Sequence, residues 1–237
     1  INAQEISLNL KGHSQADQEV LESLSAPVIF ENVAELETEI KHIQKQLYSK
    51  GYISLKFLGL KNEKLKYTAK FELGPAYKSI LIFGHSSLFK PLGYAIEKDL
   101  DSNQFYVEVP ISDLENTLNQ LSVGLSNESY TFATLQLQNI KPKDEIKIKA
   151  NLVLDKGAKR TLQKIKVLGY DDFPTSYIKY FLQIKTQKPF KLERIQSQMK
   201  LLNQLSFAQQ KRPAEVLFTK DSTTVYLYLE KIKSNRF

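Results

Sequence analysis

Phe71-Glu72-Leu73-Gly74-Pro75-Ala76-Tyr77-Lys78-Ser79-Ile80-Leu81-Ile82-Phe83-Gly84 is the most informative stretch of this sequence. It joins the end of one alternating strand to a Gly-Pro turn and then to a second short strand that ends in glycine. Two other short alternating strands also end in glycine, at Gly12 and Gly169. Gly12 and Gly84 are 72 residues apart, and Gly84 and Gly169 are 85 apart. The pattern indicates three repeats of similar size, one of which carries a loop insertion.

Each of the three glycines is followed by a segment with helical character and then by a clearer amphipathic helix. In the second helices, apolar residues recur at steps of three and four. These residues are Val33, Leu36, Ile40, Ile43 and Leu47; Leu114, Leu118, Leu121 and Leu125; and Leu192, Ile195, Met199, Leu202 and Leu205. The first helix of the third copy is expected to start at Asp172 or Thr175. In the second copy the first helix is expected around 88–96, and 99–110 is interpreted as an insertion.

Two alternating strands close each copy. The apolar positions of these strands are Ile53, Leu55 and Phe57 with Leu65 to Leu73; Ala133, Leu135 and Leu137 with Ile146 to Leu154; and Ala214, Val216 and Phe218 with Val225 to Leu229. The predicted fold class is therefore α+β, with three tandem modules over residues 1–75, 76–157 and 158–237. Each module reads strand, helix, helix, strand, strand, and two helices cover one face of a three-stranded mixed sheet. Short, turn-rich joints predict limited hinges between modules.

The composition fits a globular protein with ordinary cores, because 42% of the 237 residues are hydrophobic. The net charge is +7, of which residues 141–170 carry +6. This charge leaves open an acidic partner: nucleic acid, an anionic membrane surface or an acidic polypeptide. There is no cysteine, which excludes disulfides and thiolate chemistry. The longest apolar run, 80–83, is the size of a strand. Ile1–Gln4 fits the end of a signal peptide.

The order of elements, with the Gly-Pro junction of residues 71–84, resembles the polypeptide-transport-associated (POTRA) domains of BamA and TamA type outer-membrane assembly factors. The resemblance covers essentially the whole chain, and the module count is closer to TamA-like members. It implies the periplasmic segment of an outer-membrane protein of a Gram-negative bacterium, which precedes a membrane β-barrel. Lys233–Phe237 would end where that barrel begins. The implied partners are unfolded outer-membrane protein precursors, the chain's own barrel, and accessory periplasmic or inner-membrane-anchored proteins.

The candidate binding site is the edge of each open sheet, because an exposed edge offers unpaired backbone donors and acceptors to an extended chain. In the family this edge is the second strand. The corresponding residues are Ile53, Ser54, Leu55 and Lys56; Ala133, Thr134, Leu135 and Gln136; and Ala214, Glu215, Val216 and Leu217. The alternative interpretation is that Lys56, Gln136 and Glu215 discourage such pairing.

Two further groups are candidates for contact with a partner. Tyr226 and Tyr228 alternate with buried positions and should lie on the exposed sheet face, where they would contact a partner, the neighbouring module or the barrel. The basic side chains Lys147, Lys149, Lys164 and Lys166 should point away from the core and face anionic lipid, acidic clients or only solvent. Nucleic acid is disfavoured because no recognised binding motif is present.

Catalytic chemistry has little support in the sequence. His13, His42 and His85 share no metal-ligand spacing, and no phosphate loop or nucleophile elbow is present. Ser176 and Lys179 match Ser-x-x-Lys without its partner motifs. We therefore expect no enzyme, no cofactor and no metal. Two alternatives remain: a structural spacer or docking arm for accessory proteins, and accessory modules of an enzyme-bearing or secretion-type member of the same superfamily.

Overall fold

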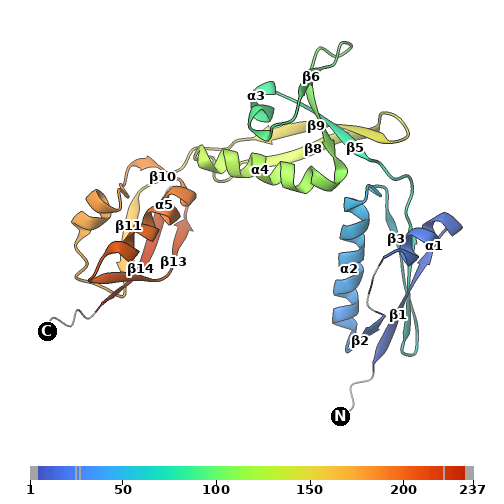
Figure 1. Ribbon diagram of the computed structural model, residues 1–237, viewed down its shortest axis with the longest axis horizontal. Coiled ribbons are helices and arrows are strands. Elements are labelled where there is room, and N and C mark those ends of the chain that lie inside the picture. Colours follow the sequence, from blue (N-terminus) through green and yellow to red (C-terminus); the bar gives the residue numbers. More distant parts are fainter. Residues whose placement is uncertain (1–4, 25, 27, 221, 233–237) are drawn as a thin grey trace. The chain divides into compact units, whose positions relative to one another are not determined.

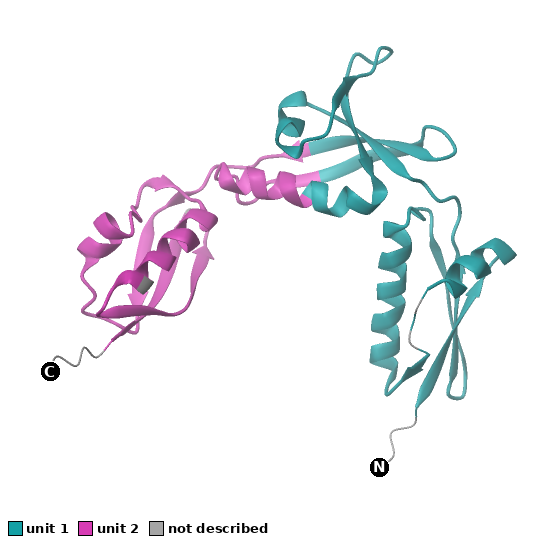
Figure 2. Cartoon of the chain, in the orientation of Figure 1, with its two compact units in different colours: residues 1–118, 136–153 teal, residues 119–135, 154–237 magenta. Residues whose placement is uncertain are grey.

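The computed structural model describes residues 5–24, 26, 28–220 and 222–232 (Figure 1). The predicted signal-peptide end at Ile1–Gln4 and the predicted approach to a barrel at Lys233–Phe237 lie outside the described residues. The chain divides into two compact units, residues 1–118 with 136–153 and residues 119–135 with 154–237 (Figure 2). All boundaries of this division fall inside the second predicted module, residues 76–157. The module boundaries predicted after residues 75 and 157 stay a prediction.

The first sheet is mixed and has the strand order β2-β1-β4-β3. β1 lies parallel to β4, in register from Ser7 opposite Lys66 to Gly12 opposite Phe71, and β3 pairs antiparallel with β4. These are the three strands predicted from the alternating pattern, and a short additional strand, β2, lies on the far side of β1. The bounds are β1 Ile6–Gly12, β2 Ile29–Phe30, β3 Lys56–Glu63 and β4 Lys66–Glu72.

Helices α1 (Gln15–Glu22) and α2 (Val33–Ser49) pack on this sheet through one shared hydrophobic core. Ser14 and Asp17 form a capping box at the start of α1, and Asn32 accepts a hydrogen bond from the Glu35 N–H at the start of α2. The α2 residues at the predicted apolar positions after the first turn are buried: Leu36, Ile40, Ile43 and Leu47.

Gly12 ends β1 where the chain turns back toward α1. A Cβ at this position would lie 2.4 Å from the backbone nitrogen of Gln18 and 2.8 Å from the Asp17 Cβ. Any larger residue would push the helix off the strand end. The recurrent glycine in the sequence thus has a steric cause in the first copy: it lets α1 approach the sheet closely.

The second sheet has the order β6-β7-β5-β9-β8, and β5 lies between the parallel β9 and the antiparallel β7. The prediction for this part was wrong in two respects. The helix expected over 88–96 ends by Leu92, and the presumed insertion over 99–110 supplies strand β7 of a hairpin. The bounds are β5 Ser79–Gly84, α3 Ser86–Phe89, η1 Lys90–Leu92, β6 Ile96–Lys98, β7 Phe105–Pro110, η2 Ile111–Asp113, α4 Leu114–Asn127, β8 Thr134–Pro142 and β9 Lys147–Asp155.

The hairpin forms because β7 has the period of a half-buried strand. Val107 and Val109 are completely buried, whereas Glu108 between them is exposed on the other face. The alternation in Tyr106-Val107-Glu108-Val109 is visible in the sequence, but the repeat pattern contains no strand there and therefore favours an insertion.

The third sheet has the order β11-β14-β13, with β11 parallel and β13 antiparallel to β14. A separate two-stranded ladder joins β10 to β12. The bounds are β10 Thr161–Leu162, β11 Lys164–Leu168, a π-helical turn Tyr177–Phe181, β12 Lys188–Pro189, α5 Leu192–Met199, η4 Lys200–Gln204, β13 Ala208–Phe218 and β14 Thr223–Lys231. The predicted second helix therefore continues past Met199 as a tighter 3-10 helix.

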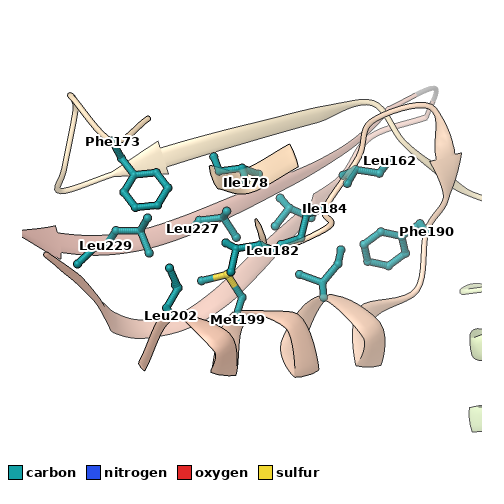
Figure 3. Packing of buried hydrophobic residues seen from close by; sticks show 13 residues of the cluster. Leu162, Phe173, Ile178, Leu182, Ile184, Phe190, Met199, Leu202, Leu227 and Leu229 are labelled. Carbon is teal, nitrogen blue, oxygen red and sulfur yellow. The ribbon is translucent and has the colours of Figure 1, made fainter. Parts of the chain in front are cut away.

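The core of this last part lies between the sheet and the helical segments (Figure 3). Leu182 and Leu202 are fully buried beside Leu227 and Leu229 of β14. In the π-helical turn, Ile178 is 5% exposed and Phe181 is half-buried. Among the residues described, no helix is long and apolar enough to cross a membrane.

Candidate functional site: sheet edges and outer faces

Each predicted second strand lies at the edge of its sheet. The strand orders put β3, β8 and β13 last in the first, second and third sheets. An edge strand has one row of backbone N–H and C=O groups that no neighbouring strand uses. The topology therefore supplies three candidate sites for the addition of an extended chain.

The strands differ in extent from the predicted residues. β3 begins at Lys56, so Ile53, Ser54 and Leu55 belong to the preceding turn, and Leu55 is buried. In the second sheet Ala133 lies just before β8, which contains Thr134, Leu135 and Gln136. In the third sheet Ala214, Glu215, Val216 and Leu217 all lie inside β13, which begins earlier than predicted, at Ala208.

The β3 edge is irregular and charged. Its register with β4 shifts between Phe57 and Gly59, which marks a bulge, and Gly59 has φ +119°. Lys56 forms an ion pair of 2.7 Å with Glu72, and Lys61 one of 2.6 Å with Glu63. Bulges and lysines are the features with which natural sheets discourage edge pairing.

The β13 edge has the same kind of protection. Its register with β14 shifts twice, between Gln210 and Arg212 and between Arg212 and Glu215. Pro213 lies within the second of these shifts and has no backbone N–H to offer to an incoming strand. The Arg212–Glu215 ion pair, 3.0 Å long, lies across the same stretch.

The β8 edge carries none of these features in its first five residues. From Thr134 to Gln138 the strand contains no charged residue, no proline and no residue with positive φ, and the backbone becomes irregular only at Asn139, which has φ +55°. Gln136 and Gln138 are exposed and share a side-chain hydrogen bond of 3.2 Å, so both lie on one face of the strand. Leu135 and Leu137 are half-buried on the other face. Of the three edges, β8 is chemically the most open to another strand.

Tyr226 and Tyr228 lie half-buried on the outer face of the third sheet, each beside a cation. The Lys166 Nζ is 5.6 Å from the ring centroid of Tyr226, and the Arg212 Cζ is 3.5 Å from that of Tyr228. The Tyr228 hydroxyl donates a 2.6 Å hydrogen bond to Glu215, which raises the pKa of Tyr228 above its ordinary value. The two rings are thus held in place by residues of their own sheet.

The four basic candidates differ in their surroundings. The Lys147 Nζ donates a 2.8 Å hydrogen bond to Glu108 of β7, which also accepts one of 2.6 Å from Ser79. These bonds lower the pKa of Glu108, and the bond to Glu108 raises that of Lys147. Lys149, Lys164 and Lys166 are exposed. Lys147 is therefore held within the sheet, and the other three face solvent.

The residues that the sequence suggested for metal binding or catalysis have ordinary local contacts. The described residues contain no group of three or more His, Cys, Asp or Glu side chains that could hold a metal ion. His42 contacts Gln46 on α2, and His85 contacts Ser87 in the next turn. The Lys179 ammonium, the second member of the Ser-x-x-Lys match, lies 5.2 Å from the ring centroid of Tyr180.

The fold also assembles a basic group that the sequence interpretation missed. Lys185, Lys188, Lys191 and Arg194 line a cavity of about 350 Å³ between the β10–β12 ladder and α5. Their regular spacing of three residues was the only signal for them. Since that spacing runs through a loop, a strand and a helix start, neither helical nor strand periodicity indicated a common site.

Comparison with known proteins adds evidence for the fold. The sequence matches no protein-family profile and no curated protein. The structure is similar to that of BamA POTRA3-5 from Haemophilus influenzae, with a TM-score of 0.58 and 14% identity over 97% of this chain and 98% of that one. POTRA1-3 of the periplasmic domain of Omp85 from Anabaena gives 0.32 with 9% identity over 98% of each chain. CdiB from Escherichia coli gives 0.29 with 15% identity over 83% of this chain and 34% of that one. The fold assignment rests on the first of these.

Proposed function

We propose that this chain, which has the fold of tandem POTRA domains, is a periplasmic segment of an outer-membrane assembly or translocation factor and that it binds unfolded polypeptide. In this proposal the bound chain is an unfolded outer-membrane protein precursor, which adds to a sheet edge as an extra strand. The segment acts by binding alone and needs no cofactor.

The β8 edge is the observation that carries the proposal. Backbone pairing does not depend on the side chains of the client, so an open edge suits a protein with many clients. Alternation adds a preference: one face of β8 presents the half-buried Leu135 and Leu137, the other the exposed Gln136 and Gln138. A client strand with alternating apolar and polar residues would extend both faces, and such alternation is typical of membrane β-barrel strands.

Single-cysteine cross-linking tests the site directly, because the chain has no cysteine of its own. A photoactivatable cross-linker is attached at Gln136→Cys in β8 and, as a matched control, at Glu37→Cys on the exposed face of α2. An unfolded peptide from an outer-membrane barrel protein should cross-link at position 136 and not at position 37. Equal labelling at both positions, or none at position 136, contradicts binding at this edge.

A docking arm for a folded accessory protein is the second candidate function. The observation that favours it is the outer face of the third sheet, where Tyr226 and Tyr228 are held rigid beside Lys166 and Arg212. Rigid aromatic side chains with adjacent cations are common at protein interfaces. A cross-linker at Lys164→Cys on this face would then capture a folded periplasmic protein, and the barrel peptide would label neither face.

A further inference from the structure

We propose that the cavity between the β10–β12 ladder and α5 binds a phosphate group, and that its source is the headgroup of an anionic phospholipid. The site is separate from the sheet edges, since β13, the candidate edge of the third sheet, contributes no residue to the cavity. The proposal therefore goes beyond polypeptide binding and does not depend on it.

All charged residues that line the cavity are cations, and Gln183 and Gln198 add neutral polar groups. Four of its lining residues, Lys185, Lys188, Lys191 and Arg194, carry positive charge, and none carries negative charge. Within the described part of the chain, none of these four forms an ion pair with an acid. Four unneutralised cations around one concavity repel one another, and an anion at its centre removes that repulsion.

The floor of the cavity is apolar and rigid. Leu162, Ile184 and Phe190 are 3%, 3% and 1% exposed, and Figure 3 shows them toward the same end of the core. Backbone hydrogen bonds fix the walls: the Gln187 N–H donates to Leu162, and the Phe190 N–H donates to Arg160. A cationic rim over an apolar floor fits an amphipathic anion better than a bare inorganic ion, because the floor can cover the carbon atoms next to the phosphate.

The first sheet provides an internal comparison. There α2 also follows a two-residue strand, but Asn32 caps it, and the Glu35 carboxylate accepts from the Glu31 N–H. At the same place before α5 stands Lys191, whose side chain makes no capping hydrogen bond. The start of α2 thus carries its own acceptor and negative charge. The start of α5 has one acid in its first turn, Glu193, but no capping acceptor, and it lies beside Lys188, Lys191 and Arg194, so a phosphate could serve as the missing acceptor.

The distribution of charge along the chain fits binding to an anionic lipid surface. Residues 158–237 contain 16 lysines and arginines against six aspartates and glutamates, a net charge of +10. Residues 1–157 contain 17 against 20, a net charge of −3. The part of the chain that forms the cavity therefore carries the entire positive excess. A surface of anionic headgroups attracts such a part as a whole, and the cavity would seat one headgroup.

Vesicle flotation with the full chain tests the proposal. The probes are vesicles of phosphatidylcholine with and without phosphatidylglycerol. The site variant Lys188→Gln/Arg194→Gln is compared with a control that removes equal charge elsewhere in the same part, Lys200→Gln/Lys220→Gln. Thermal unfolding of each variant checks that it is folded. We expect binding only to the anionic vesicles, weakened at least about tenfold in the site variant and less than about threefold in the control.

The other outcomes overturn the proposal, each in its own way. Equal weakening in both variants shows that net charge alone attracts the chain. If inorganic phosphate at low concentration displaces the chain from vesicles and shifts the backbone NMR signals of Phe190 and Arg194, the source is free phosphate. If poly-glutamate binds in a manner that depends on Lys188 and Arg194 while the vesicles do not bind, the ligand is an acidic polypeptide.

Discussion

The Tyr77 backbone N–H donates a 3.0 Å hydrogen bond to the Gly51 carbonyl, and a Cβ on Gly51 would lie only 1.9 Å from the Tyr77 carbonyl oxygen. Gly51 follows the end of α2 with φ +100°. Tyr77 lies in the Gly-Pro joint that leads into β5 and is 7% exposed. The joint is thus packed against the turn after α2.

Gly51→Ala should destabilise the protein by about 2 kcal/mol or more, because alanine is strained at this φ and its methyl group would displace Tyr77. Denaturant unfolding measures the loss. Gly124→Ala is the matched control: this glycine lies exposed in α4 with no heavy atom within 4 Å of the added Cβ. The control should stabilise α4 by about 0.5–1 kcal/mol. An unchanged stability of Gly51→Ala would show that Tyr77 yields easily.

Arg160 holds the segment before β8 against the end of β13. Its guanidinium lies 5.1 Å from the Phe132 ring centroid and donates hydrogen bonds to the carbonyls of Thr219 and Lys220. Arg160→Ala should cost about 2 kcal/mol in denaturant unfolding, and Arg160→Lys about half of that, since an ammonium lacks the fork that reaches both carbonyls. The exposed Lys164→Ala serves as control and should change stability by less than about 0.5 kcal/mol. A lysine variant as stable as the parent would contradict this role.

Leu202 is completely buried in the core of the third sheet (Figure 3). Leu202→Ala should therefore lower the free energy of unfolding by about 2–5 kcal/mol, through lost apolar burial and the cavity left behind. Val123→Ala on α4, where the valine is 53% exposed, should have little effect. Thermal melts distinguish the two, and equal losses would show that Leu202 is not part of a packed core.

The pair of Glu108 and Lys147 predicts a pH dependence of stability. The pKa of Glu108 is lowered, so its contribution is present above the pKa of an unfolded glutamate and is lost as the pH falls through the folded value. Denaturant midpoints of the parent and Glu108→Gln should therefore differ near neutral pH and converge in acid. The effect should be small, because both side chains are partly exposed. A difference that persists in acid would rule out the carboxylate as its source.

The sequence predicted the repeated elements well because their periodicity is regular and because each core forms from residues of one continuous stretch of the chain. The apolar positions of α2 from Leu36 onward are buried, although Val33 is 40% exposed, and the sheet is mixed as predicted, with β1 parallel to β4. Short pieces without a full period were missed. β2, β10 and β12 span two residues each, too few for alternation to be recognised.

The candidate sites were harder to predict, because they depend on register and on neighbours. The alternation of Ile53 and Leu55 looked like strand, yet pairing with β4 begins only at Lys56 opposite Glu72. Lys147 looked solvent-facing, but β7 brings Glu108 against it, and β7 itself was interpreted as a loop. The cationic rim joins a loop, β12 and the start of α5, and only the folded chain brings these together.

The hairpin of β6 and β7 has a consequence for self-association. It occupies the side of β5 that the repeat pattern would leave open, and its own outer strand, β6, is three residues long. β8 is therefore the longer of the two edges of the second sheet. Two copies that meet through their β8 strands would form an antiparallel pair with a short β6 strand at each outer end. Contact through this sheet alone would stop at a dimer, whereas a sheet with two long free edges could propagate into a fibre.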